Sequence, residues 1–166
     1  MGLIRIIVIG MIGVLSYSAK AQFVSERSVL NNIGKGKWEK AKTQLNKIEQ
    51  KDSVRTGVEF AWACYFFSAS NPDFQIDSAH WHIQRAISDY GKVSGKAREK
   101  LLKIPVDSNS LASYHDRIDS AAFARARDIN TEEAYLDFLK RYSNAKQRNQ
   151  AIALRDEVSY ADAIRG

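Results

Sequence analysis

The chain has 166 residues, of which 45% are hydrophobic, and it carries a formal net charge of +6. This composition fits one folded domain and excludes a disordered chain, which stays unfolded because it has too few apolar residues to bury. Two prolines and nine glycines favour a mainly helical fold, and the mild positive charge alone selects no class of partner.

Residues 1–21 have the pattern of a secretory signal peptide. Arg5 precedes an apolar run from Ile6 to Leu15, and Ala19-Lys20-Ala21 fits the small-x-small cleavage rule. We expect cleavage before Gln22 and an exported protein, either periplasmic or secreted, with a peripheral place at the outer membrane as a further option. The alternative is an uncleaved anchor, but the run is well short of the ~20 residues that span a bilayer. We therefore expect no stable membrane span after cleavage.

The part from 22 to 105 contains apolar residues at helical spacing. One stripe follows a Gly34-Lys-Gly36 break, and a second, over residues 76–90, has Gly91 as its C-cap. Between them, residues 60–67 are apolar on every side, which predicts a buried central helix that ends at Asn71-Pro72. Cys64, the only cysteine, lies in this run; it is either a small core residue, which we favour, or a reactive thiol.

The part from 106 to 166 contains an internal repeat. Residues 119–126 recur as 156–163, with an aspartate, an aromatic residue and two alanines in register at a shift of 37 residues. That period lies in the range of helical repeat proteins. Between the copies, Asn130 and Glu133 suggest a capping box that starts a helix.

These patterns predict an all-α fold of seven or eight helices, without a strand. Short polar turns favour antiparallel neighbours, so we expect a stack of helical hairpins forming a single domain over residues 22–166. Its two halves are residues 22–105 and 106–166.

Three segments resemble tetratricopeptide repeats. Gly36-Lys-Trp38-Glu-Lys-Ala41 is similar to the opening of the second helix of a unit, and residues 60–90 and 134–142 resemble further units, as in exported proteins of Bacteroidetes-type bacteria. The resemblance implies a right-handed α-solenoid that binds proteins and does not catalyse a reaction. The period of 37 and the absence of the consensus proline after Tyr142 depart from the family pattern, which puts a regular superhelix in doubt.

No catalytic, cofactor-binding or metal-binding residue is predicted. His80 and His82 flank Trp81 and point about 200° apart on a helix, whereas metal-binding pairs are three or four residues apart. The third histidine, His115, has only Asp116 and Asp119 as nearby ligand types, and these carboxylates alternate with arginines as on a solvated helix. We therefore expect a protein that is not an enzyme and has no cofactor.

The predicted function is a scaffold that binds another protein of the bacterial cell envelope. Aromatic side chains dominate binding hot spots, and the candidates are Trp81, Tyr90, Tyr135 and Tyr142. The alternative is binding of an anionic envelope glycan or lipid headgroup through two lysine-rich segments, residues 35–51 and 92–103. Export argues against nucleic acid, and the sequence leaves the partner's identity and the oligomeric state open.

Overall fold

The computed structural model describes residues 25–49 and 55–165, and this part of the chain forms eight helices and no strand. The all-α prediction is therefore confirmed. The predicted signal peptide lies outside the described residues. The helices are α1 (Glu26–Gly34), α2 (Trp38–Glu49), α3 (Thr56–Phe66), α4 (Ile76–Tyr90), α5 (Gly95–Leu101), α6 (Ser108–Ile129), α7 (Glu132–Arg141) and α8 (Arg148–Arg165).

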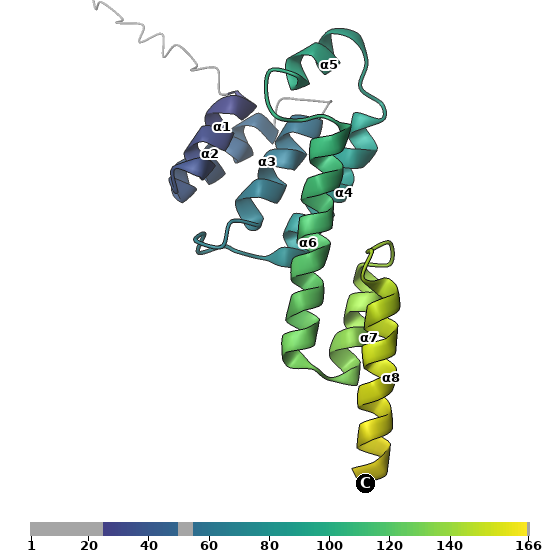
Figure 1. The fold of residues 1–166 in the computed structure, drawn as a ribbon. Coiled ribbons are helices and arrows are strands. Elements are labelled where there is room, and N and C mark those ends of the chain that lie inside the picture. The colour runs from purple at the N-terminus through teal and green to yellow at the C-terminus, as the bar shows by residue number, and fades with distance from the viewer. Residues whose placement is uncertain (1–24, 50–54, 166) are drawn as a thin grey trace, which may run out of the picture.

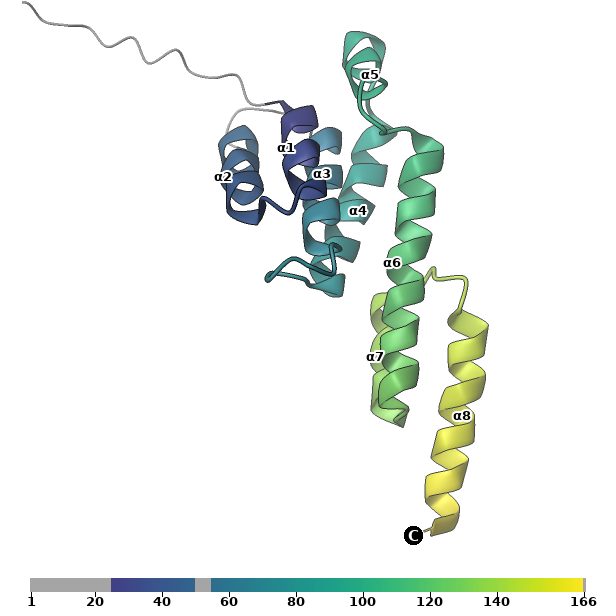
Figure 2. The same cartoon turned by 60° about the vertical axis from the view of Figure 1, so that its left-hand side comes forward.

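The helices pack mainly against their neighbours along the chain, and α6 links the two ends of an elongated molecule (Figure 1). The upper part of α6 lies beside α4, and its lower part lies beside α7, which in turn contacts α8 (Figure 2). Helices α1 and α2 both pack against α3, and α5 projects at the top. None of the described helices is both long enough and apolar enough to cross a membrane.

Helix α3 is the central helix of the first half, as its apolar sequence predicts. One side contributes Phe60 and Ala63 to a large core with α4, α6 and α7, and the other contributes Val58, Trp62 and Tyr65 to a smaller core with α1 and α2. Because both cores include α3, this helix joins the N-terminal pair to the rest of the fold. It is buried over almost its whole length.

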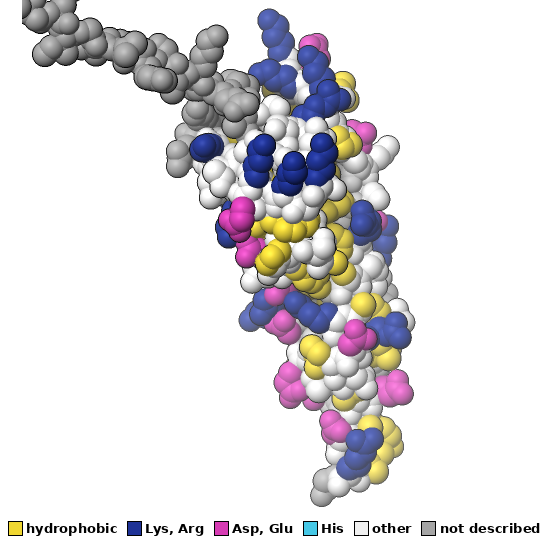
Figure 3. Space-filling view, turned by 90° about the vertical axis from the view of Figure 1, so that its left-hand side faces the viewer, with side chains coloured by type: hydrophobic (Ala, Val, Ile, Leu, Met, Phe, Trp, Pro, Cys, Tyr) yellow, Lys and Arg dark blue, Asp and Glu magenta, His cyan; other side chains and the backbone are white. Residues whose placement is uncertain are grey.

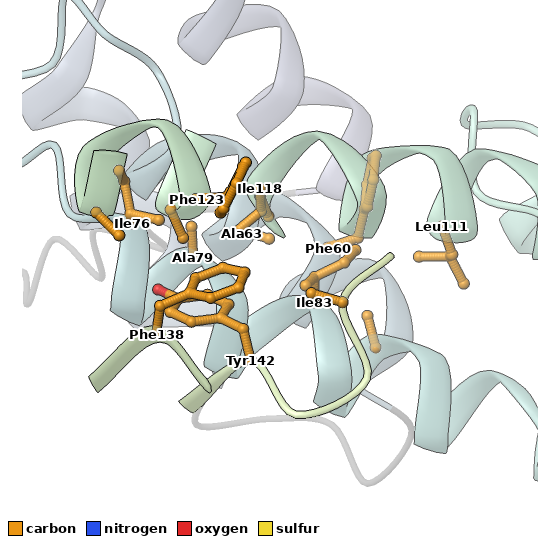
Figure 4. Close-up of a cluster of buried hydrophobic side chains, with 14 of the residues drawn as sticks. Phe60, Ala63, Ile76, Ala79, Ile83, Leu111, Ile118, Phe123, Phe138 and Tyr142 are labelled. Carbon is orange, nitrogen blue, oxygen red and sulfur yellow. The ribbon is translucent and has the colours of Figure 1, made fainter. Parts of the chain in front are cut away.

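The large core forms where α4, α6 and α7 meet (Figure 4). Ile118 and Phe123 of α6 point toward α4, and Phe138 and Tyr142 lie side by side below them. The rings of Phe138 and Tyr142 are stacked, with centroids 5.3 Å apart and an interplanar angle of 14°. This packing holds the C-terminal helices against the body of the protein.

Local sequence signals explain some of the turns and helix ends. Gly36 has a φ of +65° in the turn between α1 and α2, a conformation that favours glycine. Asp107 accepts a hydrogen bond from the backbone N–H of Ser110 at 2.7 Å, and the Ser110 hydroxyl accepts one from the Asp107 N–H in return, which forms a capping box for α6.

The start of α7 corrects one prediction. Asn130 does not cap α7; it ends α6 in the left-handed conformation, with φ 53° and ψ 49°. Asparagine adopts this conformation more readily than other non-glycine residues. Thr131 is the N-cap instead, and its hydroxyl accepts a hydrogen bond from the Ala134 N–H at 3.2 Å.

The stripe predicted on the last helix is only partly covered. Ala151 is buried, and Leu154 and Val158 are partly buried against the large core. Ile164, in contrast, is 67% exposed. Helix α8 extends beyond α7 at its C-terminal end, so no described residue covers this last part of the stripe (Figure 1).

Candidate functional site

A hollow lies between α6, α7 and the first turn of α4. We call it the α6–α7 groove, and its volume is about 340 Å³. Alanines on α6 and α7 line it where larger side chains would fill the space, and Phe138 adds an aromatic wall. Its lining residues are Asp77, Ala122, Arg125, Ala126, Ile129, Ala134, Asp137 and Phe138.

A network of paired charges forms the polar side of this groove. Asp77 accepts hydrogen bonds from Arg125 Nη2 at 3.0 Å, from Arg141 Nη1 at 3.1 Å and from the Tyr142 hydroxyl. Arg141 also donates through Nε to Asp137 at 2.7 Å. Two carboxylates therefore face two guanidinium groups, and the network is electrically balanced.

The network keeps Asp77 ionised. Burial raises the pKa of Asp77, but the hydrogen bonds from Tyr142 and Arg125 and the nearby positive charges outweigh it, so the pKa lies below its ordinary value. At neutral pH Asp77 is thus a hydrogen-bond acceptor without a proton to give. The groove combines an apolar floor with a fixed polar edge, which suits binding of an amphipathic peptide.

The four aromatic residues that the sequence suggests for partner binding differ in their exposure to solvent. Trp81 is 52% exposed, one helical turn after Asp77 on α4, and the Arg85 guanidinium lies 4.5 Å from its ring centroid. Tyr90 is partly exposed, and Arg98 lies over its ring at 4.8 Å. Tyr135 and Tyr142 are each only 1% exposed and belong to the core. Of the four, Trp81 is therefore the one most clearly presented to solvent.

Basic side chains gather on another part of the surface. Figure 3 shows dark blue Lys and Arg side chains on the upper part of the face that carries α1 and α2, with a hydrophobic band below them. In and around α5 five exposed basic residues lie close in sequence to Leu102, which is 67% exposed. These residues are Lys92, Lys96, Arg98, Lys100 and Lys103.

The three histidines lie in two different buried clusters. His82 Nδ1 is 2.7 Å from the Glu59 carboxylate, which also accepts a hydrogen bond from Arg85 Nε at 3.0 Å. His80 points away from His82 and instead lies beside His115, with ring centroids 5.1 Å apart. The prediction that His80 and His82 do not share one ion agrees with this geometry. Sequence reasoning missed the approach of His80 to His115, because it depends on how α4 packs against α6.

Cys64 is mostly buried and contacts both cores. Burial raises the pKa of its thiol to about 12, which the Tyr114 hydroxyl and Arg117 only partly oppose. The thiol is therefore protonated at neutral pH. This environment is that of a small core residue and not of a nucleophile.

Comparison with known proteins gives no match: no protein-family model, no curated protein and no solved structure is significantly similar to this chain.

Proposed function

We propose that this chain is a non-catalytic scaffold of the bacterial cell envelope, which binds a peptide or helix of another envelope protein in the α6–α7 groove. The observation that carries the proposal is the groove itself, with its alanine-lined floor beside the Asp77–Arg125–Arg141 network. One large apolar side chain of the partner would enter the hollow, as in other helix-in-groove complexes. Backbone or polar side-chain groups of the partner would form hydrogen bonds with the charged network at the edge of the groove.

The surroundings of the groove support this mode of binding. Ile129 lines it and is 56% exposed, and Trp81 lies one turn from Asp77 on α4. Exposed apolar residues beside a polar edge are typical of binding hot spots. The proposed binding surface therefore comprises the groove, Ile129 and Trp81.

The proposal includes a finer description of the fold and of the location. We infer that the α1–α2, α3–α4 and α7–α8 pairs are hairpins of a short right-handed stack like that of tetratricopeptide proteins. The signal-peptide pattern of residues 1–21 supports export. Intact mass of the protein recovered outside the cytoplasm tests this location, because a mature N-terminus at any residue but Gln22 contradicts the proposed cleavage.

Filling the groove tests the function. Ala134 is half-buried, lines the groove and packs against the large core, so Ala134→Leu adds volume to the groove, and its melting curve is compared with that of the parent chain. Ala161→Leu is a matched control, because Ala161 is also half-buried on a helix but belongs to α8, none of whose residues lines the groove. Each variant carries a photocrosslinker at position 129 and is expressed in the native envelope.

The expected result is one crosslinked protein that is captured by the parent chain and by Ala161→Leu, and is lost from Ala134→Leu. Equal capture by all three chains, with unchanged melting curves, would refute the groove as the binding site. Capture of no protein from position 129 would refute the scaffold function at this surface.

A second candidate function is binding of an anionic lipid headgroup or envelope glycan through α5. The observation in its favour is that α5 and its flanking residues carry five exposed cations and the exposed Leu102. Anionic headgroups attract such a cationic surface, and its exposed apolar side chain inserts between the lipids. Sedimentation with vesicles of anionic phospholipid at low and high salt tests it: binding that high salt abolishes supports this function, and binding unaffected by salt contradicts it.

A further inference from the structure

A second site is formed by two histidines and an aspartate where α4 packs on α6. His80 belongs to α4, whereas His115 and Asp119 are four residues apart on α6 and therefore share one face of that helix. His80 Nδ1 is 2.9 Å from Asp119 Oδ1, and His115 Nε2 is 3.7 Å from the same oxygen. One ligand atom from each residue lies within 4.8 Å of those of the other two.

The site is shielded from water. The whole residues His80 and Asp119 are 7% and 2% exposed, and the side chain of His115 is 18% exposed. The ring of Tyr142 covers His80 edge-on, with centroids 4.4 Å apart. Solvent therefore reaches the site on the side of His115.

Two nitrogens in this site have no hydrogen-bond partner among the described residues. They are Nε2 of His80 and Nε2 of His115, and both are buried. The hydroxyl of Tyr142, whose ring lies against His80, is already bonded to Asp77. A buried polar atom without a partner costs stability, so such an atom in a folded protein needs an explanation, and for His115 Nε2, which faces Asp119, a bound ion is one. In His80 it is Nδ1 that faces Asp119, so an ion shared with this carboxylate would be bound by Nδ1.

We propose that His80, His115 and Asp119 form a binding site for a divalent transition-metal ion of the zinc type. Imidazole nitrogen and carboxylate oxygen are the ligands that zinc takes at ~2.0–2.2 Å, and two histidines with one carboxylate are a recurrent set for such ions. At these bond lengths neighbouring tetrahedral ligands are about 3.3–3.6 Å apart. His115 Nε2 and Asp119 Oδ1, 3.7 Å apart, are already close to this spacing, whereas His80 Nδ1 and Asp119 Oδ1, 2.9 Å apart, have to separate slightly, which small side-chain rotations provide.

Asp116 and Asp119 are the two acidic residues of α6 beside His115. Lys146 pairs with Asp116, so Asp119 is the carboxylate left to face the two rings.

Metal titration of the purified protein tests the proposal, and the chain supplies its own control. After removal of metal with a chelator, ZnCl2 is titrated by calorimetry and CoCl2 is followed by its visible absorption. His115→Gln removes one ligand at the partly exposed edge of the site. His82→Gln is the matched control, because His82 is bound to Glu59 in the other cluster.

We expect one metal ion per chain, at least about a 10-fold loss of affinity in His115→Gln, and unchanged affinity in His82→Gln. Imidazole NMR signals of the unmutated protein give an independent readout that does not depend on the folding of a variant. Zinc should shift the signals of His80 and His115 and leave those of His82 in place. Absence of zinc binding at millimolar concentration, or a shift of His82 alone, would overturn the proposal.

Discussion

The hydrogen bond from Tyr142 to Asp77 connects the core to the α6–α7 groove, and Tyr142→Phe removes it alone. Tyr142 is 1% exposed, and its ring stacks on Phe138 and meets His80 edge-on. Phenylalanine keeps both ring contacts and loses only the hydroxyl. The change in stability therefore reports one hydrogen bond to an ionised carboxylate.

The structure sets the expected size of the effect. Hydrogen bonds to charged groups contribute about 1.5–3 kcal/mol. Asp77 keeps both arginines, and its side chain is 35% exposed, so water replaces part of the lost interaction. We therefore expect Tyr142→Phe to lower the free energy of unfolding by about 1.5 kcal/mol, the lower end of this range.

Tyr135→Phe is the matched control. Tyr135 is equally buried, but its hydroxyl donates to the neutral amide oxygen of Asn130 at 2.9 Å. A neutral hydrogen bond contributes about 0.5–1.5 kcal/mol, so Tyr135→Phe should cost less than Tyr142→Phe. Urea unfolding followed by far-ultraviolet circular dichroism measures both.

A double-mutant cycle tests the reasoning directly. If the hydroxyl acts through the carboxylate, Tyr142→Phe should cost clearly less in the Asp77→Asn background than in the parent protein. An equal cost in both backgrounds would refute the assignment of the lost stability to the charged hydrogen bond.

Three further predictions follow from the burial of particular side chains. Leu139 is 8% exposed, so Leu139→Ala should lower the free energy of unfolding by about 2–5 kcal/mol in thermal unfolding. Leu136 on the same helix is 45% exposed, so Leu136→Ala should change it by less than about 0.5 kcal/mol. Similar values for the two variants would contradict the orientation of α7. Cys64 should react with a thiol reagent far more slowly in the folded protein than in urea, because burial raises its pKa to about 12; equal rates would show that the thiol is accessible. Burial raises the pKa of Glu59, but hydrogen bonds from His82 and Arg85 bring it below its ordinary value. Ionised Glu59 therefore stabilises the folded protein at a pH above the pKa that it has in the unfolded chain, and this stability is lost as the pH falls through its pKa in the folded protein. Glu59→Gln should flatten that acid decline, and an unchanged pH profile would refute the role of Glu59.

The sequence predicts the helices well because the signals for them are local. The stripe of Ala41, Leu45 and Ile48 lies on one side of α2, and all three residues are buried. The ends are harder to predict where two caps are adjacent. Asn130 and Thr131 both suit a helix N-cap, and only the left-handed backbone of Asn130 assigns it to the end of α6.

The sites are harder to predict because they depend on which faces of distant helices meet. His80 and His115 come from different helices, and no periodicity shows that α4 places one ring on the other. The local part of the signal is the spacing of His115 and Asp119, which are four residues apart on one helical face. The groove also depends on contacts between distant helices, since Asp77 of α4 reaches Arg125 of α6 and Arg141 of α7 only in the assembled fold.

The internal repeat shows how the same sequence pattern acquires different roles in different surroundings. Phe123 in the first copy is 5% exposed, because α4 and α7 both pack against α6. Its counterpart Tyr160 in the second copy is 71% exposed near the C-terminal end of α8. Asp119 is likewise buried against His80, whereas the side chain of Asp156 is 62% exposed.

This difference gives a test in which each copy is the control for the other. Phe123→Ala should destabilise the protein by about 3–5 kcal/mol, the usual cost of removing a buried phenylalanine. Tyr160→Ala should change the free energy of unfolding by less than about 0.5 kcal/mol, as at other exposed positions. A large loss from Tyr160→Ala in the isolated protein would mean that the end of α8 is covered in solution, most simply by a second copy of the chain. Sedimentation of the parent protein and of Tyr160→Ala would then distinguish a dimer from a monomer whose α8 packs differently.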